Sequence, residues 1–147
     1  MPGTVLAIGA HYDDCVFGIA GLLLKALRSH HRVVVLSLIG DYRNWRPVRG
    51  REQQLVEGTV RIGHEYGVET RFLDFAEMSF DVSDAAARRV AKEVAAIAPD
   101  TAFMLWPHDQ HPDHERASGL SRIALGFGDR LIEPDAPFKR ATRVYQF

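Results

Sequence analysis

Short runs of apolar residues alternate along the chain with longer segments whose apolar positions recur every three to four residues. The short runs predict buried strands, and the longer segments predict helices. The strands are expected at Thr4–Gly9, Val33–Ile39, Arg71–Phe75, Thr101–Trp106 and Thr142–Phe147. The helices are expected at Val16–Arg28, Arg51–Tyr66, Ser83–Ala98 and Asp113–Leu125. This alternation indicates βαβ units, and therefore a mostly parallel sheet of about five strands.

The same alternation predicts an α/β protein with a Rossmann-like, three-layer fold. In a doubly wound sheet of this kind the strand order is 3-2-1-4-5, so the first and fourth strands are neighbours. Ligands bind such sheets in the crevice beside the carboxyl ends of these two strands. We therefore expect functional residues directly after Gly9 and directly after Trp106.

Each predicted helix carries one apolar stripe that is expected to face the sheet. The stripe of the first helix consists of Phe17, Ala20, Leu24 and Leu27, widened by Leu22, Leu23 and Ala26. The stripe of the second helix consists of Leu55, Thr59, Ile62 and Tyr66. The third helix offers Val90, Val94 and Ile97, and the fourth offers Ala117, Leu120 and Ala124.

Composition narrows the class of protein. The length suits a single domain over residues 1–147. The composition, with 46% hydrophobic and 25% charged residues, excludes disordered, collagen-like and membrane proteins. A net charge of -1 gives no electrostatic reason to expect nucleic acid as a partner, and one cysteine cannot form an internal disulfide framework. We expect no membrane segment and a cytoplasmic location, because the first residues do not form a signal peptide and no early apolar run could span a bilayer.

Clusters of histidine and aspartate stand at both expected ligand-binding positions. His11-Tyr12-Asp13-Asp14 follows the first strand, and the segment 107–114 (PHDQHPDH) follows the fourth. Two carboxylates at the place where a dinucleotide phosphate would dock favour a cation instead. His11, Asp14 and one histidine of the second cluster would supply two nitrogens and one carboxylate oxygen. Three protein ligands with one open position are typical of catalytic zinc.

Asp13 is then free to act as a general base toward water that the metal acidifies. A second histidine would stabilise the oxyanion, with Asp113 holding that histidine in orientation. Each aspartate also has a simpler interpretation as a helix cap, and an isolated histidine is usually a surface residue. The coincidence of both clusters at one crevice favours the metal site.

Two motifs identify a related family. AHYDDCVFGIAGLL resembles the AHPDDE-type motif of the LmbE/PIG-L family of zinc-dependent N-acetylglucosaminyl deacetylases, and PHDQHPDHERA resembles its HPDH motif. The resemblance covers essentially the whole chain. It implies a metal-dependent hydrolase that removes N-acetyl or other N-acyl groups from amino sugars or glycoconjugates, with Zn²⁺ as cofactor. It also implies site roles: metal ligands His11, Asp14 and His114, general base Asp13, and acid and oxyanion stabiliser His111 with its partner Asp113.

Two residues depart from the family pattern. Tyr12 replaces the usual Pro, and its hydroxyl either faces the substrate or belongs to a partly exposed aromatic side chain. Cys15 replaces the frequent Glu; it either binds a soft metal or, as we prefer, packs as a small apolar residue. Beyond the second strand, Arg43, Trp45 and Arg51 suit stacking against and hydrogen bonding to a sugar or an anionic group. The alternative for this last segment is a solvated helix start.

The main alternative to an enzyme is a catalytically degenerate metal- or sugar-binding module that acts in a larger assembly. The altered first motif supports it, and so does the length, since family members usually continue beyond a strand that matches TRVYQF. A nucleotide-binding Rossmann domain is a third, less favoured interpretation. Two histidines and one carboxylate also suit Fe²⁺, and both the acylated substrate and a homo-oligomeric state are left open.

Overall fold

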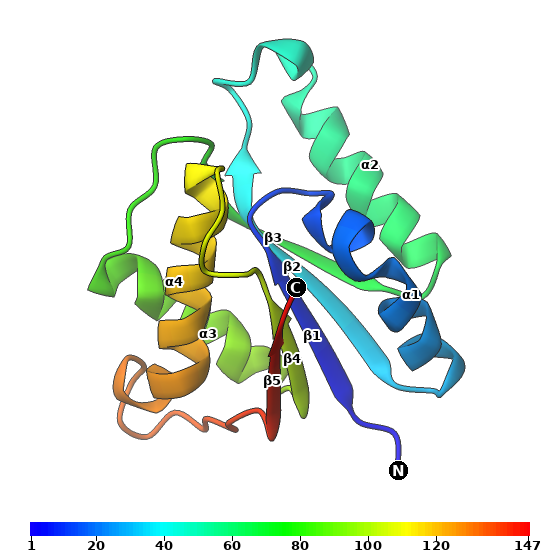
Figure 1. The fold of residues 1–147 in the computed structure, drawn as a ribbon, viewed down its shortest axis with the longest axis vertical. Coiled ribbons are helices and arrows are strands. Elements are labelled where there is room, and N and C mark those ends of the chain that lie inside the picture. Colours follow the sequence, from blue (N-terminus) through cyan, green and yellow to red (C-terminus); the bar gives the residue numbers. More distant parts are fainter.

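Five parallel strands form one sheet in the computed structural model, which describes all residues 1–147 (Figure 1). The strands are β1 (Thr4–Gly9), β2 (Arg32–Asp41), β3 (Glu69–Ala76), β4 (Thr101–Met104) and β5 (Arg143–Gln146). Their order is β3-β2-β1-β4-β5, with every neighbouring pair parallel. The predicted fold class and strand order are confirmed.

Helices cover both faces of the sheet. They are α1 (Asp14–Arg28), α2 (Glu52–Glu65), α3 (Asp84–Ile97) and α4 (Pro112–Phe127), with short 3-10 turns at Arg46–Val48 and Gly128–Arg130. Figure 1 shows α1 and α2 on one side of the sheet, and α3 and α4 on the other. Where the boundaries differ from the expected ones, they differ by one or two residues. None of the helices combines the length and the apolar character needed to cross a membrane.

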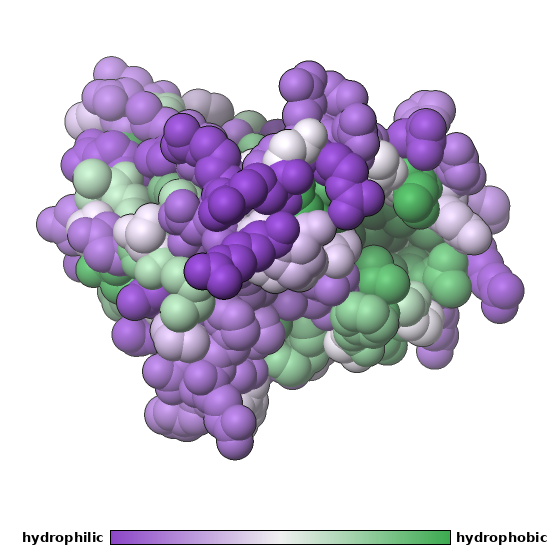
Figure 2. All heavy atoms as spheres, turned by 90° about the horizontal axis from the view of Figure 1, so that it is seen from above, coloured by the Kyte–Doolittle hydropathy of each residue, from purple (hydrophilic) through white to green (hydrophobic).

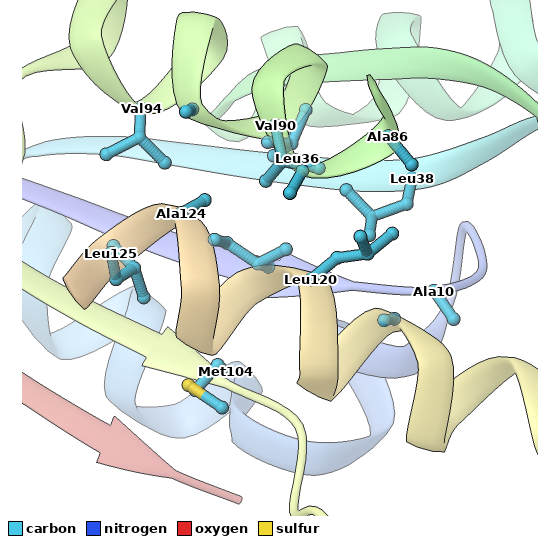
Figure 3. Close-up of a cluster of buried hydrophobic side chains, with 14 of the residues drawn as sticks. Ala10, Leu36, Leu38, Ala86, Val90, Val94, Met104, Leu120, Ala124 and Leu125 are labelled. Carbon is cyan, nitrogen blue, oxygen red and sulfur yellow. The ribbon is translucent and has the colours of Figure 1, made fainter. Parts of the chain in front are cut away.

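The main core lies between the sheet and the pair α3 and α4. It contains 24 buried residues, against seven in the cluster beneath α1, so most apolar burial supports the α3–α4 side. Figure 3 shows how β2, α3 and α4 contribute to it through Leu36, Leu38, Val90, Val94, Leu120 and Ala124. Both inner stripes predicted for α3 and α4 are buried, which confirms them. Along β1, Leu6 and Ile8 join the main core while Val5 and Ala7 join the smaller one, as expected for a central parallel strand.

The stripe predicted for α1 is only partly correct: Leu23 is buried and Leu27 packs against the smaller core, but other members of the stripe are exposed. The buried residues are Cys15, Ile19 and Leu23, whereas Phe17 is 85% exposed and Leu24 is also exposed. The three buried residues are spaced four apart and share one helix face, and the backbone leaves helical geometry at Ile19, which bends α1. Cys15 is fully enclosed, so its interpretation as a small apolar residue is confirmed, and burial raises the pKa of its thiol.

The stripe predicted for α2 is only partly correct. Leu55 and Thr59 are half-buried, but Ile62 and Tyr66 are exposed, and no residue of α2 is fully buried. The reason is position: α2 contacts mainly β3, the edge strand of the sheet, so it meets little apolar surface.

Candidate metal centre

The two predicted clusters meet at the carboxyl ends of β1 and β4, which pair directly. A cavity of about 250 Å³ opens between them. It is lined by His11, Tyr12, Asp13, Asp14, Phe17, Tyr42, Trp45, Glu77, His111 and His114. Figure 2, seen from above relative to Figure 1, shows the larger group of hydrophobic side chains around a hollow at the right, and smaller groups among hydrophilic side chains at the left.

Three side chains aim metal-ligating atoms at one point. His11 Nδ1 lies 3.3 Å from His114 Nε2, and His114 Nε2 lies 3.2 Å from Asp14 Oδ1. The ligating atoms of all three residues fall within 4.8 Å of one another. Two imidazole nitrogens and one carboxylate oxygen form a donor set that suits a divalent cation with an open position.

The turn between β1 and α1 fixes the carboxylate of Asp14. Its Oδ2 accepts hydrogen bonds from the backbone N–H groups of Ala10 and His11, both at 2.8 Å, which leaves Oδ1 toward His114. Asp13 stands at the N-cap position of α1, but its side chain makes no capping hydrogen bond. The carboxylate of Asp13 is thus not engaged with the helix, and Asp13 lines the cavity next to Tyr12.

Two further carboxylates contact the rings of His11 and His114, each at the nitrogen opposite the metal-ligating one. Asp109 Oδ2 lies 3.0 Å from His114 Nδ1, and Asp113 Oδ2 lies 3.4 Å from His11 Nε2. Such contacts fix the tautomer and the orientation of a ligand histidine. The role of Asp109 was not expected from the sequence, although this residue lies within the second motif.

The partner of Asp113 differs from the expected one. We expected its carboxylate to orient His111, but its contacts are with His11, with the backbone N–H of Met78 at 2.9 Å, and with Arg116 Nη1 at 3.1 Å. His111 instead caps α4, because its Nδ1 accepts the backbone N–H of Asp113 at 3.2 Å. An accepting Nδ1 places the proton of a neutral ring on Nε2.

A second group of ligating atoms, from His11, His111 and Asp113, also falls within 4.8 Å. It shares His11 with the first group, through the opposite ring nitrogen. Asp113 is buried and already accepts hydrogen bonds from Met78 and Arg116. The first group is therefore the better cation site.

The electrostatics of the first group agree with this assignment. Burial alone would raise the pKa of Asp14, but hydrogen bonds with His11 and His114 lower it well below its usual range. The hydrogen bond to Asp14 is the main cause that raises the pKa of His114 to about 9, and Asp109 adds to it. Carboxylates that hold a proton on an imidazole so strongly would also stabilise a divalent cation in place of that proton.

Comparison with known proteins identifies the family. Residues 6–125 match the model of the PIG-L family, described as GlcNAc-PI de-N-acetylase. The chain belongs to the PIG-L family.

Solved structures share the fold of this PIG-L chain. The N,N'-diacetylchitobiose deacetylase of Pyrococcus horikoshii is similar at a TM-score of 0.79 and 20% identity, over 97% of this chain and 59% of that one. The conserved protein TT1542 of Thermus thermophilus is similar at a TM-score of 0.77 and 20% identity, over 97% and 66%. GalB, the 4-carboxy-2-hydroxymuconate hydratase of Pseudomonas putida KT2440, gives a TM-score of 0.77 and 19% identity, over 98% and 64%. The PIG-L chain thus spans less than two thirds of the length of each of these proteins.

One side of the cavity in the PIG-L chain is an aromatic wall, formed by Tyr12, Tyr42 and Trp45. Their ring centroids lie 6.0 to 6.3 Å apart. Tyr12 and Trp45 are among the substrate-binding residues expected from the sequence. Burial raises the pKa of Tyr12, and the neighbouring carboxylate of Asp13 raises it further.

The two arginines expected beside the substrate do not line the cavity. Arg43 is 81% exposed and pairs with Asp41, and Arg51 donates to the backbone carbonyl of Pro47. Phe17, Tyr42 and Glu77 do line it; Tyr42 lies in the segment after β2 whose aromatic residues were expected near the substrate, whereas Phe17 and Glu77 were not expected there. Tyr42 and Glu77 directly follow β2 and β3, so their position at the same sheet edge was the available signal.

Proposed function

We propose that this PIG-L chain hydrolyses the N-acyl amide of an acylated amino sugar or glycoconjugate, with a divalent cation held by His11, Asp14 and His114. The observation that carries the proposal is the convergence of their ligating atoms within 4.8 Å, beside the carboxylate of Asp13. Family membership supports amide hydrolysis, and the similar structure from Pyrococcus horikoshii is a diacetylchitobiose deacetylase.

Zn²⁺ is the proposed ion, because nitrogen and oxygen ligands with one open position suit it, and Fe²⁺ suits the same set. The chemistry that such an ion supplies is Lewis acidity, which polarises the acyl carbonyl and acidifies water. His11 and His114 keep their ligating nitrogens directed at the ion because Asp113 and Asp109 hold the opposite ring nitrogens.

The remaining residues move protons. The carboxylate of Asp13 accepts a proton from the attacking water as the new C–O bond forms and the carbonyl π electrons move to oxygen. The Nε2–H group of His111, in its imidazolium form, donates a hydrogen bond to that oxygen. When the C–N bond breaks, the imidazolium form of His111 donates a proton to the nitrogen, which leaves as an amine, and the proton that Asp13 accepted from water restores the imidazolium.

The other half of the cavity suits the sugar. The flat faces of Tyr12 and Trp45 offer an apolar surface for the sugar ring. Glu77 adds a carboxyl group at the cavity wall, and burial raises its pKa. We propose that it hydrogen-bonds sugar hydroxyl groups.

An amine-release assay tests the proposed reaction. The zinc-loaded chain is incubated with N-acetyl and longer N-acyl amino sugars, with and without a chelator, and free amine is measured. We expect chelator-sensitive release. Asp13→Ala should keep its zinc and lose about 10²- to 10⁴-fold in turnover, whereas Asp135→Ala, an exposed carboxylate away from the cavity, should match the unsubstituted chain. Full activity of zinc-loaded Asp13→Ala would refute the role of Asp13.

The same assay separates the alternatives. Bound zinc without amine release over the whole panel would favour the metal- or sugar-binding module. A hydratase shares the fold. If the chain hydrates a carbonyl-conjugated alkene in a chelator-sensitive manner and releases no amine, the proposed reaction would be hydration and not hydrolysis.

A further inference from the structure

Tyr42 is the most enclosed member of the aromatic wall. Its side chain is 1% exposed, yet it lines the same cavity as His11 and Asp13. It directly follows β2, and the centroid of its ring lies 6.0 Å from that of Tyr12 and 6.1 Å from that of Trp45. A rigid, buried side chain at this place can fix the position of a ligand.

The hydroxyl of Tyr42 uses only part of its hydrogen-bonding capacity. Its oxygen accepts the backbone N–H of Tyr12 at 3.0 Å, in the turn that carries His11 and Asp13. Its proton makes no hydrogen bond to an acceptor of the protein. A buried donor without a partner is unfavourable, so its partner is expected in the cavity. Burial raises the pKa of this hydroxyl, which keeps the proton in place.

We propose that Tyr42 orients the substrate by donating this proton to a sugar oxygen, while its own oxygen holds the turn through Tyr12. The identity of the substrate in this inference rests on the proposed function. Strand order indicates that the substrate oxygen which accepts this proton belongs to the sugar. The acyl group of the substrate must reach His11 and His114, which follow β1 and β4. Tyr42 follows β2, on the opposite side of β1 from β4.

Calorimetric titration of the zinc-loaded chain with the two products, glucosamine and acetate, tests this role. Tyr42→Phe keeps the ring and removes the hydroxyl, and Tyr66→Phe makes the same change at an exposed position at the end of α2. We expect glucosamine to bind Tyr42→Phe about 3- to 10-fold more weakly. Acetate affinity and zinc content should stay unchanged, and Tyr66→Phe should match the unsubstituted chain.

Three other results would overturn the proposal. Equal glucosamine affinity in Tyr42→Phe would show that the hydroxyl does not contact the sugar. Parallel losses of acetate affinity and zinc content would show that Tyr42 acts only through the turn. Binding of acetate but not glucosamine by the unsubstituted chain would refute the amino-sugar substrate, and the sugar contact of Tyr42 with it.

Discussion

Two carboxylates contact the proposed metal ligands from outside, and they differ in burial. Asp113 is fully buried, with its Oδ2 3.4 Å from His11 Nε2, whereas the side chain of Asp109 is 39% exposed, with its Oδ2 3.0 Å from His114 Nδ1. Loss of such a partner typically weakens metal binding by about 10- to 100-fold. Water screens the exposed contact more strongly. We therefore expect Asp113→Asn near the upper end of this range and Asp109→Asn near the lower end.

The difference between the two variants should be measurable. A tenfold change in Kd corresponds to about 1.4 kcal/mol, so the zinc-binding free energies of the two variants should differ by about this amount. Zinc Kd is measured by competition with a chromogenic chelator at fixed pH. The matched control is Asp129→Asn, which removes a surface carboxylate that bonds Arg140 at 2.8 Å and should leave the Kd unchanged. Equal affinities in all variants, or a larger loss in Asp109→Asn, would refute the reasoning.

Stability must be separated from affinity in this comparison. Asp113 also accepts hydrogen bonds from Met78 and Arg116, so Asp113→Asn should lower the Tm of the metal-free chain more than Asp109→Asn, which alters a more exposed carboxylate. The competition is therefore run at a temperature at which circular dichroism shows every metal-free variant to be folded.

Three further predictions concern the ligand set and the scaffold. His114→Ala should lose its zinc, and a full zinc equivalent by metal analysis would remove this residue from the ligand set. Leu120→Ala, in the main core, should lower the free energy of unfolding by about 2 to 5 kcal/mol in urea, whereas the exposed Leu22→Ala should change it by less than about 0.5 kcal/mol. Burial alone would raise the pKa of Glu69, but hydrogen bonds from Arg32 and Arg71 lower it below its ordinary value of 4.5. The ionised carboxylate of Glu69 thus stabilises the fold above pH 4.5, and this stabilisation is lost as the pH falls through the folded-state pKa. Glu69→Gln should therefore flatten the acid side of a plot of unfolding free energy against pH. A profile identical to that of the unsubstituted chain would count against a contribution of Glu69 to stability.

The fold was predictable because its signals are local and repeated. Continuous apolar runs mark strands that are buried on both faces, and the alternation with helices restricts the topology to a doubly wound sheet. The inner stripes of α3 and α4 were correct because both helices bury these positions in the main core, where they pack against each other and α4 also packs on β1. The stripe of α2 failed at Ile62 and Tyr66 because periodicity does not reveal that a helix lies over an edge strand.

The candidate site was predictable in outline for a related reason. Strand order brings the segments after β1 and β4 together, so the two histidine and aspartate clusters had to meet. The choice of partners was not predictable, because whether the carboxylate of Asp113 contacts His11 or His111 depends on the rotation of its side chain. Tyr42 and Glu77 come from other strand ends and carry no motif of their own.

The exposed ring of Phe17 shows that the site, rather than the apolar pattern, sets the rotation of α1. Asp14 Oδ2 accepts the N–H groups of Ala10 and His11, which fixes the first turn of the helix against the end of β1. Cys15 must then face the sheet, and Phe17 falls on the rim of the cavity that it helps to line. A large apolar side chain in water is unfavourable for folding. Such conflicts between pattern and structure are expected at functional sites, so the exposure of Phe17 is itself an argument that this turn is built for binding.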